Sequence, residues 1–196
     1  MSNSNSTLST VFGYPVLYNV PYDMGNHFEQ VAPGCFDKAD LSEIRLLRDH
    51  NPSLLLSRIG TPTLTVKPDA KGLFFRATMP DTELGEETAK LLQSGVLTQL
   101  SWGWSGTVDR WSTYKGRQLR IITAVQTVWD ISLVTYPANP ATLVQLEAPL
   151  FTSTLSGRAA TFTTSTPVFD AFEDNFQWMQ QIMDADARRV YSQSNN

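Results

Sequence analysis

The chain has 196 residues, of which 41% are hydrophobic, and a formal net charge of −4. This length and hydrophobic content predict one domain with a core, together with appended segments. Lysine and arginine are scattered instead of clustered, which argues against direct binding of nucleic acid. The single cysteine, Cys35, cannot form an internal disulfide. No apolar stretch approaches about 18 residues and no secretion signal is recognisable, so we expect a soluble protein that does not enter a membrane.

Short strand-like runs dominate the chain after a tail, over residues 1–10, that is rich in serine, asparagine and threonine and predicted to be disordered. These runs are separated by Pro, Gly, Asp and Asn. The expected strands are Val11–Val20, Ile44–His50, Thr63–Lys67, Leu73–Met79, Leu97–Trp104, Gly106–Trp111 and Leu119–Tyr136, the last with a break near Asp130. About seven strands predict a small β-barrel, closed or partly open, in a mainly β protein of the α+β class.

Residues 81–95 have the pattern of a helix within this β-rich region. They offer an N-cap candidate, acidic residues in the early turns and Gly95 at the expected C′ position. The helix would lead the chain directly into the strand that contains Ser101.

The composition changes after Glu147. About half of the residues from Phe151 to Pro167 are Ser or Thr, and we predict a flexible linker over 149–167. An amphipathic helix is predicted over 168–191, with apolar residues at spacings of three and four. Such a stripe needs a partner surface. Docking onto the chain's own β domain and pairing with another subunit or a scaffold protein are both open alternatives.

The chain has only two histidines, His27 and His50, so any chemistry that needs an imidazole must use one of them. His50 closes a strand-like run that Asn51-Pro52 ends, where side chains can reach a cleft. With an ordinary pKa of about 6.5, imidazole can accept and return a proton near neutrality. A hydrogen-bonded structural histidine is the alternative. Asp49 is not expected to orient His50, because neighbouring strand residues point to opposite faces.

Ser101 and Asp130 could complete a nucleophilic site with this imidazole. Ser101 starts the segment Ser101–Trp104, in which Gly103 would admit a substrate backbone and leave amides free for an oxyanion hole. A Ser-x-Gly pattern is common, so a structural serine is the alternative. Asp130 interrupts an apolar run, where an unpaired carboxylate would be costly. Its partner could be a histidine Nδ1–H, an arginine or a strand end.

Metal and cofactor chemistry is not expected. Cys35, Asp23, Glu29 and His27 do not have metal-ligand spacing, and no Gly-rich phosphate loop, HExxH or GxSxG motif is present.

An ordered set of motifs over residues 11–148 carries a family resemblance. The motifs are Phe28–Asp37, Leu47–Pro52, Gly72–Ala77, Pro80–Thr82, Gly95, Ser101–Trp104 and Asp130–Pro140. In this order and spacing they resemble the prohead maturation proteases of tailed bacteriophages, which are distant fold relatives of the herpesvirus assemblins. The resemblance implies a serine endopeptidase on a small β-barrel with flanking helices.

The same resemblance implies roles for individual residues. His50 would be the general base and Ser101 the nucleophile. Asp130 stands where the family has a carboxylate, usually Glu, and it is one methylene shorter. The assemblins use a second histidine as the third member, which makes His27 the runner-up to Asp130.

The family role is cleavage of scaffold and major capsid protein extensions inside the immature capsid, often with self-cleavage. The implied partners are therefore the phage major capsid protein and scaffold, and the implied location is the prohead in the host cytoplasm. Dimerisation is expected by analogy with the assemblins. The segment after Glu147 would dock the enzyme or be removed. The competing hypothesis is a non-catalytic scaffold or assembly module that retains the protease fold.

Overall fold

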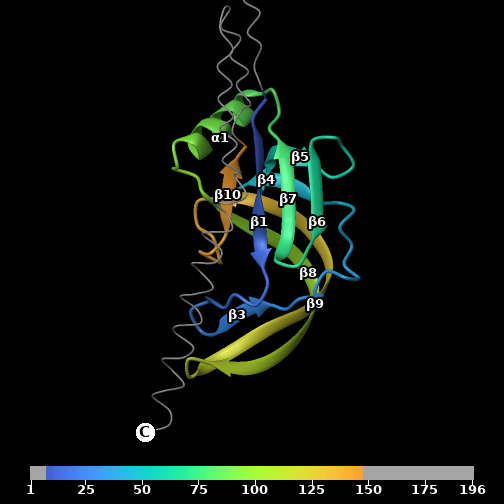
Figure 1. The fold of residues 1–196 in the computed structure, drawn as a ribbon, viewed down its shortest axis with the longest axis vertical. Helices are drawn as coiled ribbons and strands as arrows, with labels where there is room; N and C mark the ends of the chain where they lie inside the picture. Colours follow the sequence, from blue (N-terminus) through green and yellow to red (C-terminus); the bar gives the residue numbers. More distant parts are fainter. Residues whose placement is uncertain (1–7, 148–196) are drawn as a thin grey trace, which may run out of the picture. The chain divides into compact units, whose positions relative to one another are not determined.

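The computed structural model describes residues 8–147, and this part of the chain contains ten strands and one helix (Figure 1). In chain order the elements are β1 (Thr10–Leu17), β2 (Tyr22–Asp23), β3 (Phe28–Val31), β4 (Arg45–Arg48), β5 (Asn51–Arg58), β6 (Leu64–Pro68), β7 (Gly72–Thr78), α1 (Glu83–Gln93), β8 (Gln99–Tyr114), β9 (Arg117–Val134) and β10 (Leu143–Leu146). Within these residues, no helix is long and apolar enough to cross a membrane.

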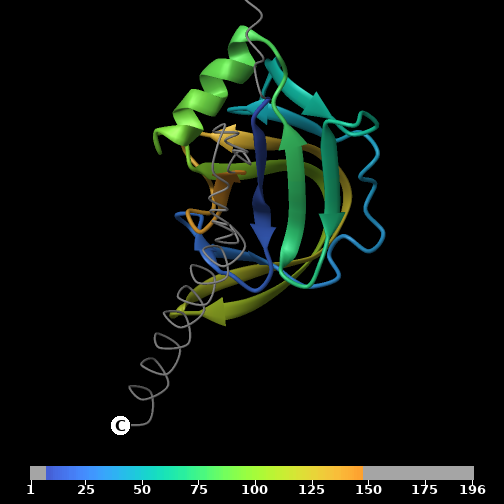
Figure 2. The same cartoon turned by 45° about the horizontal axis from the view of Figure 1, so that its top comes forward.

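The strands form two sheets, which Figure 2 shows from a second direction. The first has the order β10-β1-β7-β6 and is antiparallel throughout. The second is built on β9. One edge of β9 pairs with β8, whereas the other pairs in parallel first with β3 and then with β4. The second sheet therefore brings together three segments that are far apart in the sequence: the β4–β5 hairpin, the start of β8 and the end of β9.

The prediction of a mainly β protein is confirmed, but a closed barrel is wrong. The first sheet ends at β6 and β10 and the second at β2 and β5, and no strand of one sheet pairs with a strand of the other. In the described residues α1 is the single helix, in place of the flanking helices expected. The predicted linker over 149–167 and helix over 168–191 lie outside the described residues, as do residues 1–7 of the predicted tail.

Several strand boundaries also differ from the prediction. The expected strands Leu97–Trp104 and Gly106–Trp111 form one strand, β8, and β9 runs through Asp130 without a gap. Four strands were missed: β2 has two residues, β3 and β10 have four each, and β5 starts with Asn51-Pro52, residues that usually end a strand. Pro52 is tolerated because it lies at the exposed start of its strand.

The predicted helix is confirmed as α1, with the expected signals at both ends. The Thr82 hydroxyl accepts the Gly85 N–H at 3.2 Å, and Gly95 follows the helix in the left-handed conformation at φ 72°. The core contains apolar side chains from both sheets. Its fully buried members include Val11, Leu73 and Phe75 from the first sheet and Leu46, Leu100 and Ile131 from the second.

Candidate active site

His50 lies in a two-residue turn between two strands. Asp49 and His50 have φ of 50° and 54° and connect β4 to β5. Positive φ at both central residues is typical of the tight turn that suits a twisted hairpin. The turn is fixed to the end of β9, because the Asp49 N–H donates to the Leu133 carbonyl at 2.9 Å and the Thr135 N–H donates to Asp49 Oδ1 at 2.8 Å. Asp49 therefore anchors the turn.

The partner of Asp130 is His50. His50 Nδ1 and Asp130 Oδ1 are 2.7 Å apart, and the two side chains are 40% and 14% exposed. An ionised carboxylate can only accept hydrogen bonds, so Nδ1 carries the proton and Nε2 is left as the basic atom. The shorter side chain of Asp130 reaches the imidazole. Of the partners considered from the sequence, neither an arginine nor a strand end occupies this position.

A buried serine joins the two members of this pair. The Ser132 hydroxyl donates to Asp130 Oδ1 at 2.6 Å and accepts the His50 backbone N–H at 3.2 Å. Ser132 is fully buried. Since Asp130 and Ser132 are two residues apart on β9, their side chains share one face of the strand. The carboxylate, the imidazole and the hydroxyl therefore form one connected network.

A β-bulge and a glycine make room for the Asp130 carboxylate. Gly103 pairs with Asp130, but Trp104 pairs with Val128, so Trp129 is an extra residue in β9. Such bulges re-aim side chains and are common beside active sites. A Cβ atom on Gly103 would lie 2.0 Å from Asp130 Oδ2. Gly103 therefore admits the carboxylate of the neighbouring strand, and its expected approach to a substrate backbone stays a prediction.

Ser101 lies on β8 on the same face as this network. It is two residues from Gly103, whose Cβ direction points at Asp130, and it pairs directly with Ser132. Ser101 is partly exposed, whereas Ser132 is fully buried. Within residues 8–147 no hydrogen bond joins the Ser101 hydroxyl to His50. Next to Ser101, the Leu100 N–H and carbonyl both bond to the buried Thr142 hydroxyl, at 3.0 and 2.8 Å, which fixes the start of β8.

The electrostatics of the site favour the protonated imidazole. The hydrogen bond to Asp130 raises the pKa of His50 above its ordinary value, and the negative charges of Asp130 and Asp49 add to this effect, while partial burial opposes it. A histidine with these neighbours is a stronger base than a free imidazole. It can therefore hold a proton taken from a nearby hydroxyl.

His27, the runner-up for the third position, is remote from this site. It lies in the β2–β3 turn, where its ring is 5.5 Å from that of Trp111 and Nδ1 lies 2.5 Å from Asn26 Oδ1. Trp111 is ten positions beyond Ser101 on β8, a separation of roughly 30 Å along a strand. The structure brings together His50, Asp130 and Ser101, but not His27.

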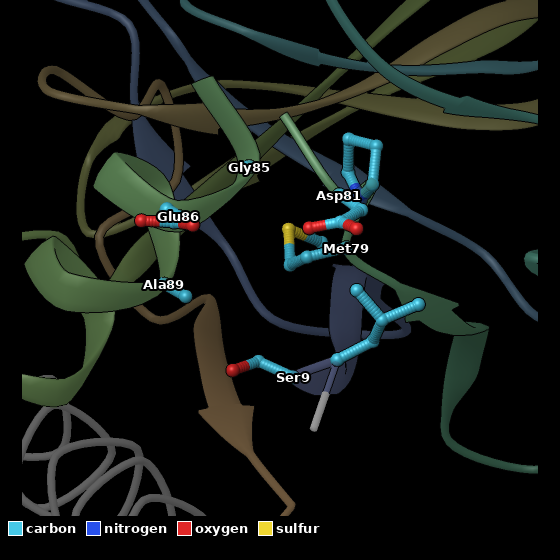
Figure 3. A pocket seen from close by; sticks show the side chains of 8 residues that line it. Ser9, Met79, Asp81, Gly85, Glu86 and Ala89 are labelled. Carbon is cyan, nitrogen blue, oxygen red and sulfur yellow. The ribbon is translucent and has the colours of Figure 1, made fainter. Parts of the chain in front are cut away.

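A small pocket lies elsewhere, where the start of β1 and the end of β7 meet α1 (Figure 3). Its lining includes Ser9, Met79, Asp81, Gly85, Glu86 and Ala89, and none of the residues of the network described above. Among residues 8–147, no group of three or more His, Cys, Asp or Glu side chains has the arrangement of a metal site.

Neither Ser132 nor the contact between Gly103 and Asp130 was predicted from the sequence. The spacing of Asp130 and Ser132 would have placed two polar side chains on one face of a strand, a signal available in the sequence. The role of Gly103 depends on which residue faces it across the sheet, and the sequence does not give the register.

A carboxylate-bound histidine beside a strand serine, on a mainly β scaffold, is the set of side chains that serine hydrolases use. The family model described as caudovirus prohead serine protease matches residues 1–175. The chain belongs to that family.

A solved structure, "Crystal structure of KSHV protease in complex with hexapeptide phosphonate inhibitor", is similar with a TM-score of 0.47 and 13% sequence identity. The similarity covers 72% of this chain, and it spans 65% of the length of that protein. A comparison with curated protein sequences finds no match.

Proposed function

We propose that this protein is a serine endopeptidase that cleaves extensions of the scaffold and the major capsid protein in the prohead, and that it also cleaves itself. Ser101 is the nucleophile, His50 the general base and Asp130 the carboxylate that orients His50. The observation that carries the proposal is the 2.7 Å hydrogen bond between His50 Nδ1 and Asp130 Oδ1, on the face of the sheet that Ser101 shares.

The proposed reaction starts with attack of Ser101 Oγ on the carbonyl carbon of the scissile peptide bond, while His50 Nε2 takes the hydroxyl proton. When the tetrahedral intermediate collapses, the C–N bond breaks and His50 returns the proton to the leaving amine. Water then attacks the ester on Ser101, again giving a proton to His50. As this second intermediate breaks down, the bond from the carbonyl carbon to Ser101 Oγ breaks and His50 returns its proton to Oγ, which releases the new carboxylic acid and restores the Ser101 hydroxyl.

Asp130 would serve this reaction without changing its own protonation state. Its hydrogen bond keeps the proton on Nδ1 and stabilises the imidazolium that forms during each step. Catalytic hydrogen bonds are often long before substrate is bound and shorten in the complex. The Ser101–His50 contact is therefore expected to form when substrate orders the site.

Co-expression with the cognate capsid and scaffold proteins tests the proposal. We expect processing of these proteins by the wild-type chain and a loss of processing for both Ser101→Ala and His50→Ala. The matched control is Ser105→Ala, which should process normally. Ser105 is a neighbouring serine on β8 whose hydroxyl accepts a hydrogen bond from the Trp129 indole. Unchanged processing with Ser101→Ala and His50→Ala would show that the assignment is wrong. Absence of processing by any chain would favour the non-catalytic assembly module.

Self-cleavage has its own measurement. Intact mass spectrometry of wild-type and Ser101→Ala chains under assembly conditions should show a shortened product for the wild type alone. The Ser/Thr-rich segment 149–167 is the expected location of the cut, since its composition predicts an accessible linker. Identical masses for the two chains would contradict self-processing.

A further inference from the structure

We propose that Ser132 is a positioning residue of the active site, one that sets both the Asp130 carboxylate and the His50 turn in their working geometry. This inference rests on the proposed function, because it assigns Ser132 a task within that site. Ser132 would act only through its two neighbours and would not touch substrate.

The directions of the two hydrogen bonds to Ser132 follow from the groups involved. A backbone N–H can only donate, so the Ser132 oxygen accepts from His50 at 3.2 Å. An ionised carboxylate can only accept, so the single hydroxyl proton goes to Asp130 Oδ1 at 2.6 Å. The proton and a lone pair of Ser132 are thus both used, and each holds a different member of the pair.

The contact with Asp130 selects the orientation of the carboxylate. Oδ1 receives the Ser132 hydroxyl as well as His50 Nδ1, while Oδ2 lies against Gly103. Because both hydrogen bonds end on Oδ1, a rotation that moved this atom away from the imidazole would also break its bond to Ser132. Ser132 therefore opposes the motion that would misalign the pair.

The contact with His50 acts on the backbone. His50 has a φ of 54°, a conformation that costs energy for a residue with a side chain. The bond from its N–H to Ser132 is one of the contacts that hold this conformation, together with those of Asp49 to β9. Because the imidazole is attached to this backbone, its distance to Asp130 depends on the turn staying closed.

Ser132 is not itself a second candidate nucleophile. It is fully buried, and its proton is donated to the Asp130 carboxylate and not to the His50 imidazole. Its cross-strand partner, Ser101, is the partly exposed serine of the two. The two serines therefore have different roles: Ser101 faces the substrate, and Ser132 holds the His50–Asp130 pair in place.

The test compares Ser132→Ala with Ser57→Ala in the full-length protein. Ser57 is the matched control, because it is also buried and its hydroxyl bonds to another side chain, Thr63, at 2.7 Å. The first measurement is the rate at which a fluorophosphonate probe labels Ser101, as a function of pH. The second is the pKa of the His50 imidazole by NMR, for which His27→Gln leaves a single histidine signal.

We expect Ser132→Ala to lower the labelling rate by about 10²-fold, the size of effect that a misplacement of about 1 Å produces. The pKa of His50 should fall toward its value in Asp130→Asn, because the contact with Asp130 raises it most and Asp49, in the same turn, adds to that effect. Ser57→Ala should change neither quantity. An unchanged labelling rate, or a pKa of His50 that stays the same or rises, would overturn the inference.

Two further results separate the possible failures. If Ser132→Ala does not fold, Ser132→Cys keeps the size and a weaker donor, and it should show the same shifts with smaller amplitude. If the probe does not label Ser101 in the wild-type chain, the proposed function fails. The NMR titration still decides whether Ser132 holds the His50–Asp130 pair.

Discussion

The carboxylate of Asp130 occupies the space that a side chain on Gly103 would take. A Cβ atom at position 103 would lie 2.0 Å from Asp130 Oδ2 and 3.0 Å from its Cγ. The two residues are direct partners across β8 and β9, beside the bulge at Trp129. The orientation that brings Oδ1 to His50 therefore depends on the absence of a side chain on the opposite strand.

Gly103→Ala is expected to displace the carboxylate and disable the site. We predict a fall in kcat/KM of about 10²-fold and a loss of about 1–3 kcal/mol in unfolding free energy from overpacking. The measurements are cleavage of a capsid-protein extension and urea unfolding. Gly116→Ala is the control. It meets no atom within 4 Å but has a φ of 74°, so it should lose stability and keep its kcat/KM. Equal kcat/KM in the two variants would contradict the proposed cause.

Asp130→Asn should separate geometry from charge. The amide keeps the size of the carboxylate but lacks the negative charge that keeps the proton on His50 Nδ1 and stabilises the imidazolium. We therefore expect kcat to fall by about 10⁴-fold, as when a triad carboxylate is replaced. The general base must be neutral, so activity rises as pH increases through the pKa of His50. Asp130 raises that pKa. On the acid side of the pH–rate profile, the acid limb, the activity of the variant should therefore rise at lower pH than that of the wild type. A limb at the same or higher pH would contradict this role.

The pH dependence of stability provides a test that needs no substrate. Because the pKa of His50 is raised in the folded state, its stabilising effect is fully present below the unfolded value of about 6.5. This effect is lost as pH rises through the higher folded-state pKa. The difference in unfolding free energy between wild type and His50→Asn should thus be larger at pH 6 than at pH 9. Asn suits the comparison, since it tolerates positive φ. A difference that grows with pH would exclude the raised pKa.

The reactive side chains could be predicted from the sequence more fully than the strand pairing and register that position them. With two histidines in the chain, the choice of base was narrow, and the carboxylate in an apolar run required a partner. The His50–Asp130 hydrogen bond supplies that partner. The catalytic roles stay predictions until the variants are measured.

What could not be predicted depends on register and on contacts distant in sequence. Asn51-Pro52 was interpreted as the end of a strand, yet β5 starts there because Asn51 pairs with Arg48 across a two-residue turn. The tandem pairing of β3 and β4 along one edge of β9 is set by tertiary packing, and no local pattern encodes it. The strands form two sheets that do not close, so only the closed form of the expected barrel was wrong.

Asp49→Ala is expected to loosen the turn that holds His50. The change removes the acceptor of the Thr135 N–H and places alanine at a φ of 50°. Together, the lost hydrogen bond and the backbone strain should cost about 2 kcal/mol of unfolding free energy. Asp49→Asn keeps an acceptor and a residue suited to this conformation, so most of that stability should remain. Similar losses in both variants, measured by urea unfolding, would show that the contact with Thr135 is unimportant.

A second charged network lies toward the far end of the β8–β9 hairpin and should affect stability alone. The Arg120 guanidinium donates to Glu29 at 2.9 Å, to Asp109 at 2.8 Å and to Thr107 at 3.0 Å, and Glu29 is 4% exposed. Arg120→Met would remove the ion-pair partner of the buried Glu29 and of the partly exposed Asp109. We expect a loss of about 2 kcal/mol, below the usual range for a buried pair because Arg120 is partly exposed.

The control for this prediction adds Glu29→Gln to Arg120→Met. Glutamine removes the unpaired charge and can still accept the hydrogen bond that Tyr22 donates to Glu29. Part of the lost stability should return. The NMR pKa of His50 should be unchanged in both variants, because Arg120 and Asp130 are ten positions apart on β9. If the second change restores no stability, the loss arises from the packing of the Arg120 side chain, for example against Trp104, and not from the buried charge of Glu29.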